Sequence, residues 1–483
     1  NLRSVRIANP VELLHGGKTG EKEPKTKWIM AILGVVLLGV GYYISFTTKS
    51  PLKALTLFFL AVICVIVGTY LLFIAGSIAL LKTMKKNKRY YYQTSHFTSV
   101  SGLIYRMKQN AVGLANICIL STMVLVMVST TSAFMVGAED IIRTRYPHEF
   151  EIGSSDTAIV EEMEQFMETE DVQVQNQVHY TYLSFSALRE RERFYIPDDT
   201  ENLQINDYDM DALFEIILLT QEEYSRLTGT TASLSDNEVL LYATNKQVKY
   251  DTLNMLDMEL HVRGLLDEFP AAPTGVVGTV GLIVKDEAVL NVLNERQAAK
   301  YGKFASVITT QYEFDLAEGD QETVYWDLRE WMHEHVEYDY RIAGSYNARE
   351  SFMSLYGGLF FLGIFLGLLF LVETILIIYY KQISEGFDDQ KRFAIMQNVG
   401  MSRAEVKRTI HSQIVIVFFL PLLIALLHVL AAFPLISRLL VLMNMTNTSL
   451  YLLCMLACFL VFAVVYAIVY LMTAKVYYRI VSK

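Results

Sequence analysis

Long apolar segments restrict this chain more than any other feature of its sequence. Of its 483 residues, 53% are hydrophobic, and the mean hydropathy is +0.31. Several uncharged runs exceed the roughly 18 residues that mark a helix able to cross a bilayer. Buried helices of a soluble core do not account for so many long runs, so we predict a polytopic α-helical membrane protein. Six membrane-spanning helices are expected, at residues 28–46, 54–81, 111–137, 352–380, 414–433 and 449–474.

Charged residues are distributed unevenly among the segments that join these spans. Residues 139–350 carry 43 acidic and 16 basic residues, whereas the segments 1–27, 82–108 and 381–411 are basic. Short basic loops stay on the cytoplasmic side of a membrane. Because basic segments alternate with weakly charged or acidic ones, we expect cytoplasmic termini and an extracellular domain at residues 138–351.

The N-terminal end of the sequence shows no signal-peptide pattern, because the first apolar run is too long and lacks a cleavage site of small residues. The chain also does not begin with Met. We therefore expect it to be the later part of a longer polypeptide.

The acidic segment is long enough to build its own core. Helical periodicity alternates there with strand-like patterns, which predicts an α+β domain. The helical patterns cover residues 157–170 and 324–338, and the strand patterns cover 172–185, 278–285 and 304–314. The segment has no cysteine, so we expect it to fold without disulfides. Its negative charge argues against nucleic-acid binding.

Gly-Gly-Lys-Thr at residues 16–19 has most of what a phosphate-binding loop needs. That loop also requires a glycine five residues before its Gly-Lys-Thr, a preceding strand and a following helix. Glu12 occupies the glycine position, and Pro10 and Pro24 oppose the strand and the helix. We therefore interpret the fragment as a basic cytoplasmic linker, and we expect no nucleotide site in this chain.

Candidate metal ligands are sparse. His333 and His335 are two residues apart and point to different faces of a helix, whereas a zincin needs two histidines four apart. Cys454 and Cys458 share a helix face but have no further ligands nearby in the sequence. Packing and solvation explain these residues better than a metal site, and no catalytic group is evident.

Two ionisable residues lie within the predicted spans. Glu373 is about two turns from the cytoplasmic end of its span, and His428 is near the outer end of its own. Such residues are candidates for function. Both also lie near an interface, where their side chains could reach water.

The loop at residues 381–411 predicts a short helix. Gly386 is expected to end the preceding helix, and Asp388 and Asp389 suit the positive N-terminal end of a new helix. Within it, apolar residues at intervals of three form a stripe. The stripe consists of Phe393, Met396 and Val399.

A break and a second helix start follow this stripe. Gly400 is a natural C-terminal stop, and Ser402 with Glu405 matches a capping box that opens the next helix. The short helix could lie on the membrane surface or insert into a soluble partner to transmit force. We favour insertion into a partner.

Two segments resemble a known family. The stretch "GFDDQKRFAIMQNVGMSRAEVKRTI", residues 386–410, resembles the cytoplasmic signature of FtsX-like permeases, the membrane subunits of mechanotransmitting ABC transporters. "NPVELLHGG", residues 9–17, is similar to the segment that follows the first four-helix unit of such permeases.

The topology resembles the Bce-type branch, which is linked to resistance to bacitracin and other cell-wall-directed peptides. That branch has ten spans, so the first four would be absent here. The resemblance implies the following order of parts: a cytoplasmic linker (1–27), two accessory helices (28–81), a basic cytoplasmic loop (82–110), the first helix of the FtsX-like unit (111–137) and an extracellular domain (138–351). After the domain come a span (352–380), a coupling loop (381–411), the last two spans (412–474) and a cytoplasmic tail (475–483).

The resemblance also implies the partners. A separate ABC ATPase dimer would bind ATP and Mg and grip the coupling loop, leaving this chain without cofactor, metal or catalytic residue. The implied coupling residues are Phe387, Asp388, Asp389, Arg392, Phe393, Met396, Val399, Gly400, Ser402 and Glu405.

The resemblance further implies that the permease acts in a bacterial cell membrane on a peptide antibiotic bound to a lipid-linked cell-wall precursor, and that a sensor histidine kinase accompanies it. Two alternatives remain open. One is another FtsX-like transporter, for lipoprotein, lipid or peptide export. The other is a non-transporting signalling protein whose extracellular domain senses a ligand.

Overall fold

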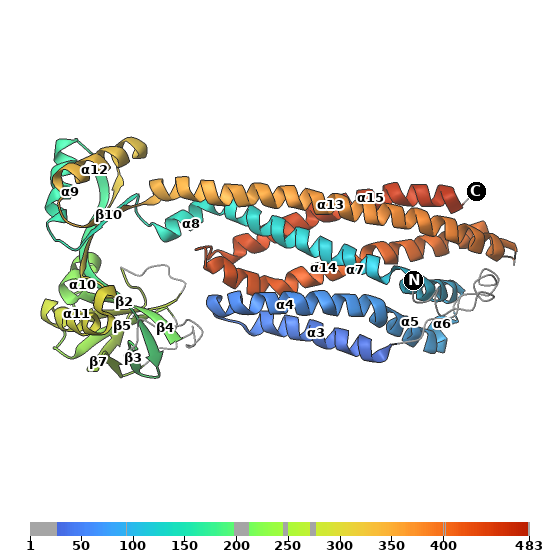
Figure 1. Ribbon diagram of the computed structural model, residues 1–483, viewed down its shortest axis with the longest axis horizontal. Coiled ribbons are helices and arrows are strands. Elements are labelled where there is room, and N and C mark those ends of the chain that lie inside the picture. The colour runs from blue at the N-terminus through green and yellow to red at the C-terminus, as the bar shows by residue number, and fades with distance from the viewer. Residues whose placement is uncertain are drawn as a thin grey trace.

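The computed structural model describes residues 27–92, 94–197, 212–244, 250–270, 277–398, 400 and 402–481. A bundle of long helices carries a sheet-containing domain at one end, so that the molecule is elongated (Figure 1). We call the two ends of the bundle the domain end and the far end. The Gly-Gly-Lys-Thr fragment lies outside the described residues.

Six helices of the described residues are long and apolar enough to cross a membrane, which confirms the prediction of six spans. These spans lie in α3 (Trp28–Thr47), in α4 (Pro51–Leu71) as continued by the π-helix η1 (Leu72–Gly76) and α5 (Ser77–Lys86), and in α7 (Thr94–Val136), α13 (Ser345–Asn398), α14 (Arg403–Val441) and α15 (Thr448–Val481).

The basic segment expected as a loop at residues 82–110 is mostly helical. Helix α5 continues to Lys86, α6 covers Lys88–Tyr91, and α7 already begins at Thr94. Lysine and arginine are good helix formers, so their charges mark the end of the apolar part of a helix without ending the helix itself. The segment between these two spans is therefore largely helical, and its cytoplasmic position stays a prediction.

The accessory helices α3 and α4 pack closely at glycine. A Cβ atom added to Gly68 would lie 3.0 Å from the backbone oxygen of Gly34, and one added to Gly34 would lie 3.0 Å from Cβ of Leu71. Small residues of this kind allow helix backbones to approach each other inside a membrane. The two helices thus form a tight hairpin.

A buried histidine attaches this hairpin to α14. The His428 side chain lies in α14 and is only 3% exposed. Its Nδ1 is 2.6 Å from the Tyr42 hydroxyl of α3, and its Nε2 is 2.9 Å from Thr69 Oγ1 of α4. From its position near the end of the predicted span, His428 could have reached the membrane interface. The structure shows instead that its side chain is buried in the bundle. Both ring nitrogens have partners inside the bundle.

The sheet domain confirms the predicted α+β class and has two lobes. In the first lobe, α9 and α12 cover one face of a sheet with the strand order β10-β1-β9-β2. The apolar core between them contains Phe150, Tyr312, Phe166 and Met332. The elements are β1 (Phe150–Ser154), α9 (Ile159–Thr169), β2 (Val174–Glu190), β9 (Thr309–Leu316), α12 (Gln321–His335) and β10 (Tyr340–Ala343).

The second lobe continues the same sheet. Strand β2 pairs with β9 through its first half and with β4 through its second half, so it belongs to both lobes. Because β4 pairs with β2 as well as β8, the strands of this lobe close into a ring. Its elements are β3 (Arg193–Tyr195), β4 (Leu213–Thr220), α10 (Gln221–Thr228), β5 (Glu238–Ala243), β6 (Thr252–Met255), β7 (Met258–Leu265), β8 (Gly278–Val284), α11 (Glu287–Tyr301) and the 3-10 turn η4 (Gly302–Phe304).

Two neighbouring connections join the domain to the bundle. Helix α8 (Ala138–Arg145) leads into β1, and β10 leads into α13. The backbone N–H of Ser345 donates to the carbonyl oxygen of Glu149 at 3.0 Å. Gly344 has φ +153°, and a Cβ atom there would lie 2.0 Å from the same oxygen. Only glycine fits this close approach, which makes the joint short and well defined.

Two carboxyl groups oppose each other just above this joint. Glu151 of β1 is the register partner of Glu313 of β9. Burial, followed by the charge of Glu313, raises the pKa of Glu151 to about 7. Burial also raises the pKa of Glu313, which accepts a hydrogen bond from the Tyr180 hydroxyl at 3.0 Å. In the folded domain Glu151 is therefore mostly protonated below about pH 7.

The histidine contacts predict a stability effect. Tyr42→Phe removes one partner of a buried imidazole, and interhelical hydrogen bonds in membranes contribute about 0.6 to 1.7 kcal/mol. We expect a lower unfolding temperature of the purified chain in lipid nanodiscs. Tyr43→Phe is the control, because the neighbouring Tyr43 is exposed. Equal unfolding temperatures of the two variants would contradict the proposed attachment.

The Glu151 pKa predicts a pH effect. The carboxyl titrates near pH 4.3 when unfolded and near 7 when folded, so the domain should lose stability as pH rises from about 4.5 to 7. Glu151→Gln should remove part of this loss and stabilise the domain at pH 8 by about 1 to 3 kcal/mol. Urea unfolding of the full chain in nanodiscs can be followed by fluorescence of Trp326 and Trp331 in α12. The exposed Glu259→Gln is the control, and an unchanged pH profile in Glu151→Gln would refute the assignment.

Candidate functional site

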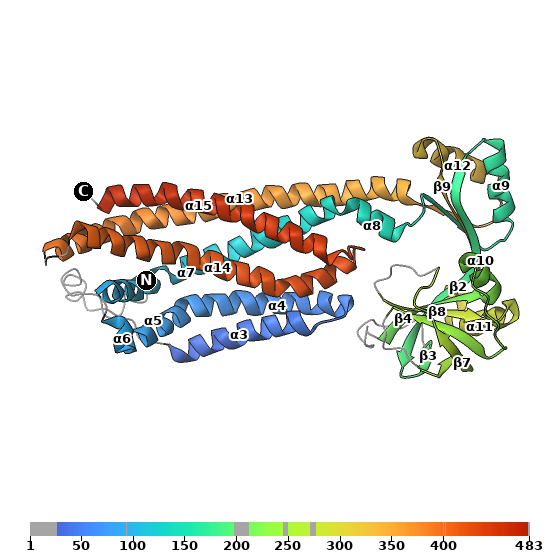
Figure 2. The same cartoon turned by 180° about the vertical axis from the view of Figure 1, so that it is seen from behind.

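Helix α13 connects the sheet domain to the far end of the bundle without interruption (Figure 2). It has 54 residues, which corresponds to about 80 Å at 1.5 Å per residue. After Lys381 it extends for roughly another 25 Å. There it meets the start of α14, and we call residues 386–405 the elbow.

Gly386 does not end the helix, contrary to our prediction, and the separate short helix expected from Asp388 is the last part of α13. A Cβ atom on Gly386 would lie 3.4 Å from Cδ2 of Tyr477 and from Cγ2 of Ile480 in α15. Glycine lowers helix propensity by about 1 kcal/mol. Here, packing against α15 keeps it helical.

Polar contacts fix the inner side of this last part of α13. Asp389 is only 4% exposed and accepts a hydrogen bond from the Tyr477 hydroxyl of α15 at 2.5 Å. Glu385 is also buried and accepts from the side-chain amide of Asn110 in α7. Lys381 Nζ donates to the Asn110 carbonyl oxygen at 3.3 Å. Asp389 thus attaches α13 to α15, and does not mark the first turn of a new helix.

The outer side of the elbow is apolar in part. Phe387 is 58% exposed, and Ile395, which the sequence analysis did not single out, is 63% exposed. The backbone positions of Asp388, Arg392, Phe393 and Met396 lie in α13, but their side chains are outside the described structure, as is residue 399. Ile395 does not fall on the three-residue spacing of the predicted stripe, so the sequence pattern did not indicate it.

The helix break itself lies where the sequence placed it. Helix α13 ends at Asn398, Gly400 has φ +108°, and α14 begins at Arg403, directly after Ser402. A positive φ of this size favours glycine. The Glu405 side chain, the other half of the predicted capping box, is outside the described structure. The coupling role of these residues stays a prediction.

Basic residues gather near the far end of the bundle. Lys85 and Lys86 lie in the last turn of α5, Lys88 and Arg89 in α6, and Arg479 in the last turn of α15. The acidic segment 139–350 contains the strands and helices of the sheet domain at the other end. Charge is thus polarised along the molecule.

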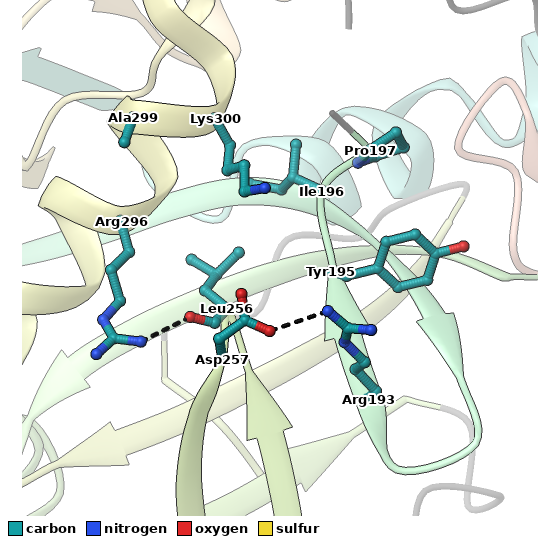
Figure 3. Close-up of a pocket in the computed structure, with 9 residues that line it drawn as sticks. All are labelled: Arg193, Tyr195, Ile196, Pro197, Leu256, Asp257, Arg296, Ala299 and Lys300. Atoms are coloured by element: carbon teal, nitrogen blue, oxygen red, sulfur yellow. Dashed lines mark hydrogen bonds and ion pairs between the residues drawn. The ribbon is translucent and has the colours of Figure 1, made fainter. Parts of the chain in front are cut away.

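A pocket of about 440 Å³ lies in the second lobe of the sheet domain (Figure 3). Its arginines hold the turn between β6 and β7, where Leu256 and Asp257 both have positive φ. Arg193 donates to Asp257 Oδ1 at 2.9 Å, and Arg296 donates to the Leu256 carbonyl oxygen at 2.9 Å. These contacts give the basic residues a structural role. The sequence had not indicated this pocket.

The described residues contain no group of three or more His, Cys, Asp or Glu side chains placed to hold a metal ion. His335 stacks on Trp331 with ring centroids 3.9 Å apart. All four cysteines are free thiols; Cys64 and Cys118 are buried in the bundle, and Cys454 and Cys458 are partly buried. The geometry gives His335 and the buried cysteines packing roles.

Comparison with known proteins adds a family assignment for the C-terminal part. Residues 356–477, which include most of α13, the elbow, α14 and most of α15, match the C-terminal domain of FtsX-like permeases. The matched region therefore contains the candidate site.

Curated relatives extend the similarity over most of the chain. The ABC transporter permease protein YxdM of Bacillus subtilis is 23% identical over 446 residues, covering 89% of this chain and 65% of the relative. The bacitracin export permease protein BceB of Bacillus subtilis is 22% identical, covering 85% and 64%. BceB of Halalkalibacterium halodurans is also 22% identical, covering 83% and 61%.

The chain spans somewhat less than two thirds of the length of these three relatives. Its elbow lies within a recognised permease domain, and the longer alignments cover 83% to 89% of the chain. The chain therefore carries an FtsX-like permease domain and is a distant homologue of Bce-type and related ABC transporter permeases.

Proposed function

We propose that this chain couples ATP hydrolysis by a separate ABC ATPase to movement of its sheet domain. The observation that supports this most is the continuity of α13, which connects β10 of the domain to the elbow in one helix. In this proposal the ATPase binds the elbow, and ATP and Mg bind to the ATPase. Closure of two ATPase subunits would then move α13.

Two sets of contacts suit α13 to this task. At the far end, Asp389 and Glu385 attach it to α15 and α7, so that a displacement at the elbow moves several helices together. At the domain end, Gly344 and the Ser345–Glu149 hydrogen bond leave no flexible linker between helix and sheet. A stiff helix with short joints transmits displacement with little loss.

The proposed orientation follows from the charge distribution. Basic residues near the far end would face the cytoplasm of a bacterial cell, together with both termini. The sheet domain, residues 138–351, would be extracellular. In this orientation the elbow would lie on the side of the membrane where ATP is available.

The substrate is proposed from the relatives. Two of them are described as bacitracin export permeases. We infer that this chain confers resistance to, and takes part in sensing of, peptide antibiotics that target the cell wall. The sheet domain would contact the peptide or its complex with a lipid-linked precursor, and a sensor histidine kinase would bind the permease in the membrane.

Substitution at the elbow tests the coupling. Phe387→Asp places a charge on an exposed apolar side chain, and burying it in an interface without a partner is strongly unfavourable. The variant should insert into the membrane at the normal level. Co-purification with the partner ABC ATPase, and resistance to bacitracin, should both fall at least tenfold.

Phe393→Asp, on the predicted stripe, should behave in the same way. Gln390→Ala on the same stretch of helix is the control and should leave both measurements unchanged. If Phe387→Asp and Phe393→Asp keep the ATPase bound but abolish membrane insertion, the elbow packs against lipid and the coupling proposal fails.

Salt tests the role of the acidic domain. With 43 acidic and 16 basic residues over 139–350, the domain should attract a cationic peptide antibiotic from a distance. Raising NaCl from about 20 to 300 mM shortens the Debye length from roughly 20 to 6 Å. We expect association, measured by surface plasmon resonance on the full chain in nanodiscs, to slow about tenfold, with a smaller change in dissociation. An association rate independent of salt would exclude electrostatic steering.

A further inference from the structure

Glu373 stands apart from every other residue in the predicted spans. It is the only Asp, Glu, Lys or Arg within the six apolar segments 28–46, 54–81, 111–137, 352–380, 414–433 and 449–474. An ionised side chain in the hydrocarbon region is costly and usually faces a protein partner or a water-filled cavity. The contacts of Glu373 are therefore informative.

The structure places Glu373 on the outside of the bundle. Thr374 and Ile378 on α13 are buried, but Glu373 is exposed, together with Leu369, Val372 and Leu376. We call the surface formed by Leu369, Val372, Glu373 and Leu376 the Glu373 face. Glu373 makes no hydrogen bond or ion pair with any residue that the structure describes.

The face that packs on α7 is a different one. A Cβ atom on Gly363 would lie 2.5 Å from Thr131 Oγ1, and one on Gly367 would lie 2.7 Å from Val128 Cγ2. These glycines bring α13 against α7, whereas a Cβ on Gly358 meets no atom within 4 Å. Gly358 is exposed and lies about 60° around the helix from Glu373, at 100° per residue. The outer side of α13 thus has room for a close approach as well as a carboxylate.

Glu373 lies too far from the end of its predicted span for contact with water to explain its exposed position. Glu373 precedes Lys381 by about 12 Å along the helix axis. Its exposed neighbours are all large and apolar. His428, the other ionisable side chain of the spans, satisfies both ring nitrogens inside the bundle. The described part of the bundle therefore supplies hydrogen-bond partners for His428 but none for Glu373, whose partner would lie outside the bundle.

We propose that the Glu373 face binds a further membrane-spanning helix that presents a basic or amide side chain at the depth of Glu373. Charge complementarity selects this occupant, because a carboxylate in an apolar medium requires a hydrogen-bond donor. A second copy of this chain related by a two-fold axis through this face would oppose two carboxylates, which repel each other. The α13 surface is an interface in this proposal, and lipid does not cover it.

The test uses the full chain in nanodiscs of phosphatidylethanolamine and phosphatidylglycerol. Three labelled leucine-based transmembrane peptides differ at one central position, which holds Lys, Asn or Leu. Binding is measured by energy transfer to a dye on the chain. In parallel, dicyclohexylcarbodiimide, a lipid-soluble reagent for protonated carboxyl groups in apolar surroundings, modifies Glu373, and mass spectrometry quantifies the product.

We expect the Lys peptide to bind about threefold to fifteenfold more tightly than the Leu peptide, in line with interhelical hydrogen bonds, with the Asn peptide between them. The Lys peptide should also protect Glu373 from modification. Glu373→Gln should reduce the advantage of the Lys peptide to that of the Asn peptide. Glu373→Leu should make the three peptides equivalent.

A relocated carboxyl group tests whether the surface matters. Glu373→Leu combined with Ile468→Glu moves the carboxyl to an exposed site on α15, seven residues before Lys475. The peptide preference should not return. Its return would show that any lipid-facing carboxyl suffices, and would overturn the assignment to α13.

Three further results would also overturn the proposal. Equal binding of the three peptides to the unmodified chain would show that the face has no preference for a donor. Protection of Glu373 that grows with chain concentration in the absence of peptide would identify a second copy as the occupant. Absence of modification with and without peptide would show that the carboxyl reaches the headgroup region and needs no partner.

Discussion

The backbone of a membrane span must satisfy its own hydrogen bonds, because the hydrocarbon core supplies no other partners. This constraint makes each apolar segment a continuous helix, and α13 continues beyond its candidate span, which ends at Phe387, as far as Asn398. One hydrogen-bonded rod thereby reaches from a sheet to an elbow on the opposite side of the bundle. The side chains of α13 then decide what it is attached to: glycines toward α7, buried carboxyls toward α7 and α15, and an exposed carboxyl toward the outside.

The sequence predicted those features that depend on composition over many residues. The six spans follow from hydropathy, and the strands β2, β8 and β9 with the helices α9 and α12 follow from periodicity. The break near Gly400 was also predictable, because a glycine followed by a serine cap is a local signal. Each of these signals is contained within the segment that it describes.

Features that depend on contacts between distant segments were not predictable. Gly386 has the local character of a helix stop, but Tyr477 and Ile480 of α15 cover it and the helix continues. His428 has the position of a residue near an interface, but Tyr42 and Thr69 from the accessory hairpin enclose it. At the candidate site, exposure of Ile395 depends on how α13 is turned against its neighbours, and the burial of Asp389 depends on Tyr477. No spacing rule within the loop contains this information.

The two chain connections of the sheet domain lie side by side, as the hydrogen bond between Ser345 and Glu149 demonstrates. A domain whose entry and exit are adjacent occupies a single point on the surface of the protein to which it is attached. The helices on either side of that point can keep their packing whatever fold is placed between them. In evolutionary terms, the domain is a replaceable module: the recognition surface can diverge, enlarge or be exchanged for another while the membrane bundle and its elbow are inherited unchanged.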